Sequence, residues 1–243
     1  MNYHWNWSIF WDPSPSGTGT YLDMLLSGLV LTIETALCAW ILALVFGSIV
    51  GVMRTLPSKA AQRISFAYIE LFRNMPLLVQ LFLWFFVLPE LLPRAWGLWL
   101  KQFPNAPFYN AVIGLGLFMS ARVAVQLAAG ISALPRGQRM AGTALGLTTL
   151  QTYRYILLPM AFRIILPPLT SEFLNTIKNS SVAITIGLIE LTGQARAMQE
   201  FSFQVFEAFT AATILYLIVN IVVVVAMRFV ERGVAIPGYI TGK

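Results

Sequence analysis

The sequence predicts an all-α integral membrane protein with about five transmembrane helices. Of its 243 residues, 58% are hydrophobic and only 11% are charged. A water-soluble domain of this size would have about a quarter of its residues charged. The mean hydropathy of the chain is +0.73. Because one crossing takes about 20 apolar residues, this length allows about five crossings and short loops, with no separate soluble domain.

Five apolar regions follow one another along the chain. They lie at about residues 21–55, 61–92, 108–134, 160–191 and 205–229. The stretch before them, residues 1–20, contains no lysine or arginine and is rich in tryptophan, which is typical of an interfacial aromatic belt. We therefore expect an uncleaved N-terminal tail on the outer face. Cys38 is the single cysteine and lies in an apolar run, which excludes a disulfide framework.

Prolines and charged residues interrupt two of the regions. Pro76 predicts a break or kink in the second region, where Glu70 and Arg73 are spaced to pair on one helix face. In the fourth region, Pro167 and Pro168 predict a discontinuous helix. Such a helix is tolerated at membrane depth only where it is buried in protein or lines a cavity. We expect the fourth region to border an internal path.

Basic residues fall mainly on one side of the expected spans. Ten of the 16 lie in expected cytoplasmic segments and three in the expected outer loops, residues 89–107 and 192–204. The ten are Arg54, Lys59, Arg63, Arg136, Arg139, Arg154, Arg163, Arg228, Arg232 and Lys243, and the three are Arg94, Lys101 and Arg196. This bias places the N-terminus outside and the C-terminus in the cytoplasm. It also explains the net charge of +6 without a nucleic-acid partner.

The segment between the third and fourth regions has a different character. Residues 140–145 are mostly small, and Gly146 can adopt the left-handed conformation that ends a helix. Thr148 with Gln151 three residues later fits a capping box that opens a second helix. Pro159 stands where the next element is expected to begin. We predict two short helices joined at Gly146.

The spacing in this segment resembles the cytoplasmic signature loop of the membrane subunits of bacterial ATP-binding-cassette importers. The family pattern is E-A-A, three residues, G, nine residues and I-x-L-P, and Met140 and Gly142 depart from it. The residues that match with intervals intact are Ala141, Gly146, Ile156, Leu158 and Pro159. In the family this loop docks into a cleft of the ATPase subunit. The resemblance implies a coupling loop at 135–159 that acts through Met140, Ala141, Gly142, Ala144, Leu145, Gly146, Ile156, Leu158 and Pro159.

Three further strings resemble the polar-amino-acid branch of this family, at residues 70–80, 134–138 and 178–191. The whole chain is most similar to the permease subunits of bacterial glutamate/aspartate importers. The resemblance implies a type I importer permease fold and ATP-driven import of an acidic amino acid. Permeases for glutamine, histidine or arginine share most of these motifs and remain an alternative.

Charged residues at membrane depth are candidates for the substrate path, because burying an ionisable group in the bilayer is costly unless it is paired or hydrated. Arg122 and Lys178 are the deepest cations, and either would suit a carboxylate substrate. Glu34, Glu70 and Glu172 are alternative structural partners for these cations. The predicted path residues are Arg122, Lys178, Glu70, Arg73, Pro76 and Glu172.

The chain lacks both a GxxxxGK[ST] phosphate loop and an HExxH motif, so we expect no cofactor here and ATP with Mg on a partner ATPase. The resemblance further implies a dimeric ATPase, a second permease subunit (a paralogue or a second copy), a periplasmic amino-acid-binding protein and surrounding lipid. It places the chain in the bacterial inner membrane, with a tail at 1–20 and a transmembrane domain at 21–243. A secondary transporter would have no need of the signature loop, and a membrane enzyme would need paired catalytic groups.

Overall fold

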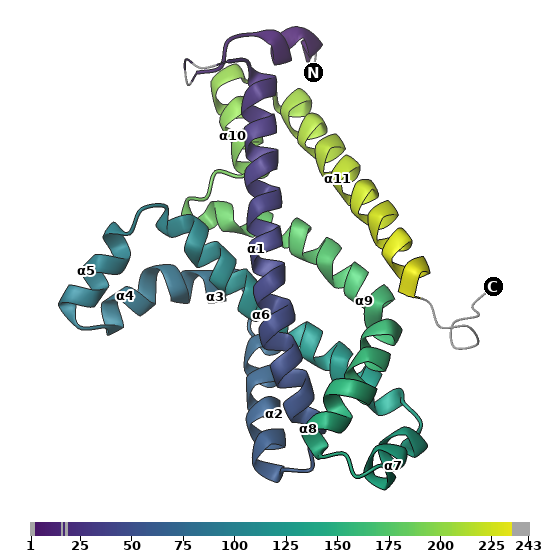
Figure 1. Cartoon of the computed structure of the whole chain (residues 1–243). Coiled ribbons are helices and arrows are strands. Elements are labelled where there is room, and N and C mark those ends of the chain that lie inside the picture. Colours follow the sequence, from purple (N-terminus) through teal and green to yellow (C-terminus); the bar gives the residue numbers. More distant parts are fainter. Residues whose placement is uncertain (1–2, 16, 18, 235–243) are drawn as a thin grey trace. The chain divides into compact units, whose positions relative to one another are not determined.

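The computed structural model describes residues 3–15, 17 and 19–234. The expected cytoplasmic C-terminus with Lys243, and residues 1, 2, 16 and 18 of the expected tail, lie outside this range. In chain order the helical elements are η1 (Trp7–Trp11), α1 (Tyr21–Thr55), α2 (Lys59–Asn74), α3 (Leu77–Phe82), η2 (Leu83–Val87), α4 (Leu88–Leu91), α5 (Arg94–Gln102), α6 (Ala106–Ala133), α7 (Arg136–Ala144), α8 (Thr149–Thr152), η3 (Tyr153–Leu157), α9 (Leu158–Asn179), η4 (Ser180–Ile186), α10 (Leu191–Ser202) and α11 (Val205–Val234) (Figure 1). Within the described residues the only extended pairing is an isolated bridge between Pro13 and Thr20, so the all-α prediction is confirmed.

Four helical runs are long and apolar enough to cross a membrane. They are α1, α6, α11 and a run of 38 residues, Thr149–Ile186, that joins α8, η3, α9 and η4. The pair of α2 with Leu77–Leu91 supplies a fifth crossing if it forms one broken span. The prediction of about five spans is confirmed in the described chain.

The chain divides into two compact units, with boundaries inside the long helices. Unit 1 comprises Met1–Trp40, Pro76–Gly116 and Asn175–Val222, and unit 2 comprises Ile41–Met75, Leu117–Leu174 and Val223–Lys243. Each unit has its own interior, and each is described separately below.

Unit 1 has a core of side chains from α1, α10 and α11, and η1 adds Ile9 to it. The N-terminal tail packs against the start of α11. The Tyr3 hydroxyl donates to the fully buried Glu207 carboxylate, and the Asn6 amide donates to the same carboxylate at 2.8 Å. Desolvation and the neighbouring Glu207 carboxylate raise the pKa of the Tyr3 phenol. The part of the tail that is described is thus held in place by a buried charge rather than by aromatic residues alone.

Unit 2 is built on a close approach of α1 to α6. A Cβ at Gly47 would lie 2.7 Å from the carbonyl oxygen of Ser120, and one at Gly51 would lie 2.9 Å from that of Ala124. The two glycines therefore set the distance between the helices. The Tyr68 hydroxyl of α2 lies 2.7 Å from the Ser120 hydroxyl, which joins α2 to the same face of α6.

Two of the helical runs pass a proline by widening into a π-turn. In η2 and η3 the amide after the widened segment bonds to the carbonyl five residues earlier, Leu88 to Leu83 and Leu158 to Tyr153. Each π-turn ends two residues before a proline, Pro89 or Pro159. Widening relieves the clash between a proline ring and the carbonyl four residues before it. The predicted start of an element at Pro159 is confirmed to within one residue, since α9 begins at Leu158, and the helical run continues into it from the π-turn.

The prediction that Pro167 and Pro168 interrupt the fourth span is wrong. Both lie inside α9, because the fixed φ of proline is compatible with a helix even though each ring removes one amide donor. The regular α-helix instead gives way to the 3₁₀ segment η4, which ends at Gly187 with φ of +89°. At the second region the prediction is confirmed, because α2 ends at Met75 in an extended conformation directly before Pro76.

The two expected outer loops contain helices. Residues 89–107 include α5, and residues 192–204 are mostly α10, so the segments expected to be outer loops are largely helical. Apolar side chains at helical spacing in α10, Leu191, Ala195 and Met198, are fully buried in the core of unit 1. Burial of this stripe accounts for a helix in a segment whose composition looks polar.

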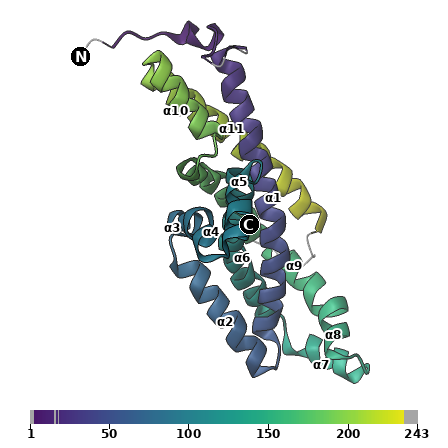
Figure 2. The ribbon, with the colours of Figure 1, turned by 90° about the vertical axis from the view of Figure 1, so that its left-hand side faces the viewer.

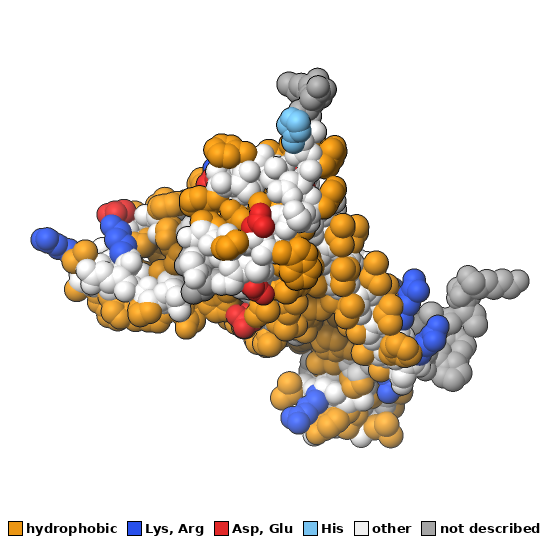
Figure 3. All heavy atoms as spheres, turned by 90° about the horizontal axis from the view of Figure 1, so that it is seen from above, with side chains coloured by type: hydrophobic (Ala, Val, Ile, Leu, Met, Phe, Trp, Pro, Cys, Tyr) orange, Lys and Arg blue, Asp and Glu red, His pale blue; other side chains and the backbone are white. Residues whose placement is uncertain are grey.

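Hydrophobic side chains are widely exposed on the surface of the chain. Long stretches of α1 and α11 expose valine, leucine and isoleucine. Figure 3 shows many such side chains on the face that it presents, with few acidic and basic residues among them. In water this exposure would be unfavourable, whereas lipid or a partner subunit would cover it.

Candidate functional site

The segment predicted to join two short helices does so at Gly146. The helix α7 ends in a Schellman motif, in which the Leu147 amide bonds to the Gly142 carbonyl and the Gly146 amide bonds to that of Thr143, each at 3.0 Å. Gly146 has φ of +73°, as this motif requires of the residue after the cap. The predicted left-handed glycine is confirmed.

The next helix opens with the predicted capping box. The Thr148 side chain accepts from the Gln151 amide at 3.3 Å, and the Gln151 side chain accepts from the Thr148 amide at 2.8 Å. Two amide donors that would otherwise lack a partner at the helix start are thereby satisfied. The connection between α7 and α8 is fixed at both ends by hydrogen bonds of its own.

The two helices of this segment meet at Gly142. A Cβ there would lie 3.0 Å from the Thr152 side chain and 3.2 Å from the Cδ1 atom of Ile156. Gly142 is buried, although the signature pattern has alanine at this position. Glycine lets α7 lie directly against Thr152 and Ile156. Figures 1 and 2 show α7 beside α8. Ile156 of the predicted coupling set therefore packs inside the segment.

Tyr153 ties the segment to the end of α1. Its side chain is 4% exposed, and its hydroxyl donates to the Thr55 carbonyl oxygen at 2.7 Å. The Arg139 guanidinium lies 5.9 Å from the centre of the Tyr153 ring, which adds a cation–π contact from α7. A displacement of α7 would therefore be transmitted through Tyr153 to a membrane-spanning helix.

The segment carries large apolar side chains that the described residues leave uncovered. Met140 is 70% exposed, Leu145 76% and Leu150 77%. Ala141 and Ala144 are small and exposed between them, so another protein can approach the α7 backbone closely. A rigid helix pair with a thin, exposed apolar face is suited to docking into a cleft of a partner protein. Leu158 and Pro159, by contrast, lie past the π-turn, at the start of α9.

Arg122 on α6 faces Glu172 on α9. The closest nitrogen and oxygen atoms are 3.9 Å apart, and the guanidinium also lies 5.2 Å from the centre of the Phe118 ring. The Arg122 side chain remains 43% exposed, whereas that of Glu172 is 13% exposed. Two residues predicted for the substrate path thus come together. The long separation leaves the guanidinium free to bind a further carboxylate.

Of the other predicted path residues, Glu70 and Arg73 lie in unit 2, and Pro76 and Lys178 lie in unit 1. Glu70 and Arg73 are both exposed on α2, and Glu70 accepts a hydrogen bond from the Asn74 amide group at 2.8 Å. The expected Glu70–Arg73 pair is absent from the described structure. Pro76 stands exposed before α3, and Lys178 is exposed near the end of α9, in unit 1.

A buried carboxylate that sequence reasoning did not select lies at the start of α10. Glu190 is fully buried and accepts from the Tyr216 hydroxyl at 2.6 Å, the Thr32 hydroxyl at 3.2 Å and the Gly193 amide at 3.2 Å. It thereby joins α1, α10 and α11 within unit 1. Its only sequence signal is an acceptor side chain directly before the helix, and the distant Thr32 and Tyr216 give none.

Comparisons with known proteins agree on one kind of molecule. A family model described as "Binding-protein-dependent transport system inner membrane component" matches residues 43–236. The chain is 46% identical to the glutamate/aspartate import permease protein GltJ of Escherichia coli (strain K12), with 100% of each chain covered. It is 30% identical to the glutamine transport system permease protein GlnP of the same strain, over 95% of this chain and 98% of that one. A crystal structure of an amino acid ABC transporter with histidines superposes with a TM-score of 0.74 and 29% identity, over 87% of this chain and 94% of that one.

Proposed function

Because the chain belongs to the family of binding-protein-dependent transport system inner membrane components, we propose that it is the permease subunit of an ATP-driven importer of glutamate and aspartate. Membership of the family confirms the permease fold and the inner-membrane location predicted from the signature segment. The full-length similarity to a glutamate/aspartate import permease supports the substrate.

The observation that supports coupling to a separate ATPase is the exposed apolar face of α7 and α8. Met140, Leu145 and Leu150 are each at least 70% exposed, on helices whose connection is fixed by the Schellman motif and the capping box. ATP and Mg would bind to the ATPase, and the α7–α8 segment would dock on it. Movement of the docked segment would reach α1 through the bond between Tyr153 and Thr55.

The remaining partners follow from the family. A binding protein would deliver the amino acid from outside, and a second permease subunit, a paralogue or a second copy, would complete the passage. This arrangement requires the N-terminus outside and the α7–α8 segment in the cytoplasm, as the distribution of basic residues indicates.

Arg122 is the residue best suited to the substrate within the passage. An anionic amino acid in a low-dielectric passage needs a compensating cation that also lets it go. In the structure Arg122 pairs with Glu172, and the guanidinium nitrogen and carboxylate oxygen are 3.9 Å apart, which is beyond hydrogen-bond distance. A substrate carboxylate would compete with Glu172 for the planar guanidinium, so binding would be reversible. Lys178 is the second candidate, since its side chain is exposed.

Uptake by the reconstituted importer tests this function. The permease is incorporated into proteoliposomes with its ATPase and binding protein, and initial uptake of labelled glutamate, aspartate, glutamine, histidine and arginine is measured with and without internal ATP. We expect ATP-dependent uptake of glutamate and aspartate only. Uptake of glutamine alone would assign the substrate of the relative that is 30% identical instead. Uptake without ATP would indicate a secondary transporter and would refute the proposal.

A further inference from the structure

A cavity of about 780 Å³ opens in unit 2 beside the start of the α7–α8 segment. One of its walls is a single face of α6, formed by Val125, Ala128, Ala129 and Ser132. These residues recur at intervals of three and four, as neighbours on one helix face do. The face runs about 10 Å along the helix axis. Three of its four side chains are alanine or serine, so the wall is shallow and leaves a groove along the helix.

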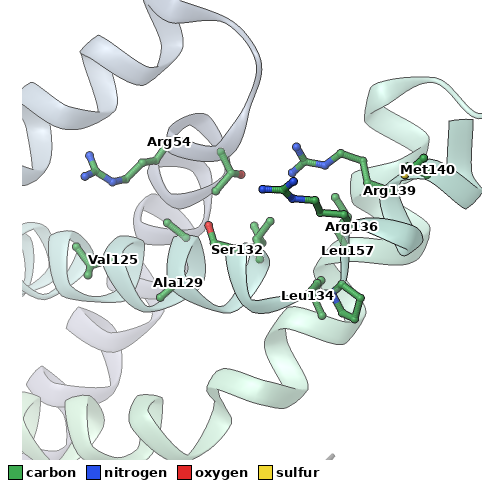
Figure 4. Close-up of a pocket in the computed structure, with 13 residues that line it drawn as sticks. Arg54, Val125, Ala129, Ser132, Leu134, Arg136, Arg139, Met140 and Leu157 are labelled. Atoms are coloured by element: carbon green, nitrogen blue, oxygen red, sulfur yellow. The ribbon is translucent and has the colours of Figure 1, made fainter.

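Three arginines line the same cavity. Arg54 comes from the end of α1, and Arg136 and Arg139 come from α7. Figure 4 shows the guanidinium groups of Arg136 and Arg139 side by side, reaching from α7 toward Ser132, whereas that of Arg54 points away from them, toward the Val125 end of the α6 face. No aspartate or glutamate is among the residues that line the cavity, all of which are described. Within the described chain none of the three arginines forms an ion pair.

The arginines are held by contacts that leave their charge uncompensated. Arg54 lies 5.7 Å from the centre of the Phe66 ring, and Arg139 lies 5.9 Å from that of Tyr153. Aromatic faces orient a guanidinium but supply no negative charge. Three cations around one hollow therefore create a positive potential that favours a bound anion.

We propose that this cavity binds an anionic phospholipid of the membrane. Its phosphate would lie between Arg136 and Arg139, with Arg54 adding to the positive potential, and an acyl chain would lie along the apolar face of α6. Arginine holds a phosphate at two points, and basic pockets between transmembrane helices are suited to anionic headgroups. The proposal depends on the membrane location of the chain and not on which amino acid it transports.

The shape of the cavity favours a lipid over other anions. A free phosphate or a dicarboxylate would use the arginines and leave the groove from Val125 to Ser132 empty. An acidic side chain of the ATPase would do the same. A phospholipid satisfies both features, since an anionic headgroup meets the arginines at the end of a membrane-spanning helix and the acyl chain covers apolar surface that otherwise meets water.

Lipid retention by the assembled importer tests the proposal. The complex is purified from nanodiscs that contain phosphatidylglycerol and phosphatidylcholine in equal amounts, and the lipids that stay bound are quantified by native mass spectrometry. We expect retention of phosphatidylglycerol about tenfold above phosphatidylcholine, from about 1 kcal/mol per arginine after competition with the bulk lipid. Arg136→Gln should lower the retention of phosphatidylglycerol about fivefold, the factor that corresponds to one such cation.

Two matched variants separate the headgroup from the chain. Arg63→Gln removes the same charge from an exposed position on α2 that does not line the cavity, and it should leave retention unchanged. Ser132→Phe fills the groove without changing the charge, and it should lower retention of phosphatidylglycerol as Arg136→Gln does. If Arg136→Gln or Ser132→Phe fails to assemble, the other of these two variants still decides the result.

Four results would overturn the proposal. These are equal retention of the two lipids, an equal loss in Arg63→Gln, full displacement of the lipid by millimolar inorganic phosphate or glutamate, and binding by the free permease that disappears when the ATPase is added. The third result would assign the cavity to a free anion, and the fourth to an acidic surface of the ATPase.

Discussion

Replacing Gly146 with valine tests whether the geometry of the α7–α8 connection transmits the energy of ATP hydrolysis. Gly146 has φ of +73°, and no atom outside its immediate chain neighbours lies within 4 Å of a Cβ built on it. The substitution therefore causes no collision with the rest of the protein. Its effect is confined to the backbone conformation at the end of α7.

The expected cost follows from that conformation. A left-handed backbone costs an ordinary L-residue about 1–2 kcal/mol, and a β-branched side chain is among the least tolerant. Relaxing the strain would break the bonds from Leu147 to Gly142 and from Gly146 to Thr143. Each contributes about 1 kcal/mol. Because both losses are local to an exposed segment, membrane insertion should be unaffected, while α7 should lose its fixed direction relative to α8.

The assay compares ATP-dependent uptake with ATP hydrolysis in proteoliposomes at equal amounts of complex. We expect Gly146→Val to reduce uptake about tenfold, as a loss of about 1.4 kcal/mol in the coupled state would do, and to retain most of the hydrolysis. Gly146→Asn is the matched control, because asparagine adopts the left-handed conformation more readily than other residues with a side chain. It should keep most of the uptake.

Normal uptake by Gly146→Val would refute the reasoning, because the strained variant would then couple as well as the native chain. So would an equal loss in both variants, since that would point to the added side chain itself rather than to the backbone.

Three further substitutions test other contacts. Arg122→Ala should lower glutamate uptake about tenfold per folded complex, because this is the loss expected for one charge-assisted hydrogen bond. Arg122→Lys should restore part of the uptake. Normal uptake by Arg122→Ala would show that the residue is dispensable for transport. Tyr216→Phe removes the shortest hydrogen bond to the buried Glu190 and should lower the free energy of unfolding by about 2 kcal/mol, so an unchanged thermal midpoint of the purified complex would contradict the role of this bond. Tyr153→Phe removes the bond to the Thr55 carbonyl and should raise the number of ATP molecules hydrolysed per amino acid imported, whereas an unaltered ratio would show that this contact transmits nothing.

Features set by local backbone chemistry could be predicted from the sequence. The left-handed Gly146 and the capping box of Thr148 and Gln151 depend on residues at most a few positions apart, and both are present. The bend before Pro76 has the same origin, because proline disfavours the helical conformation of the residue before it. The signature spacing is built from such features, which is why it identified the family.

Features that depend on distant packing could not be predicted. Pro167 and Pro168 were expected to break α9, and a proline pattern does not reveal whether the surrounding protein holds the helix together. The helix α10 was expected to be a loop, because its buried stripe is recognisable only once its partners in unit 1 are known. Glu190 was not selected for the same reason, since Thr32 lies 158 residues away in the chain.

The pairing of charges was predicted only in part. Glu172 was among three acidic residues considered as partners for the deep cations, and it is the one that faces Arg122. Glu70 has the helical spacing to pair with Arg73, yet it bonds to Asn74 instead. Spacing along a helix permits several partners, and the choice among them is set by side-chain conformation rather than by sequence.

Site-specific cross-linking tests the central claim, that the exposed face of α7 docks on a separate ATPase, most directly. Cys38 is replaced by serine, and a single cysteine is introduced at Leu145, which is 76% exposed, or at Leu91, which is 77% exposed on α4, as the control. Each is labelled with a photoactivatable cross-linker in the assembled importer, and the products are identified by mass spectrometry. We predict a covalent product with the ATPase from Leu145→Cys and none from Leu91→Cys. Absence of the ATPase product from Leu145→Cys, or equal products from both positions, would contradict the account.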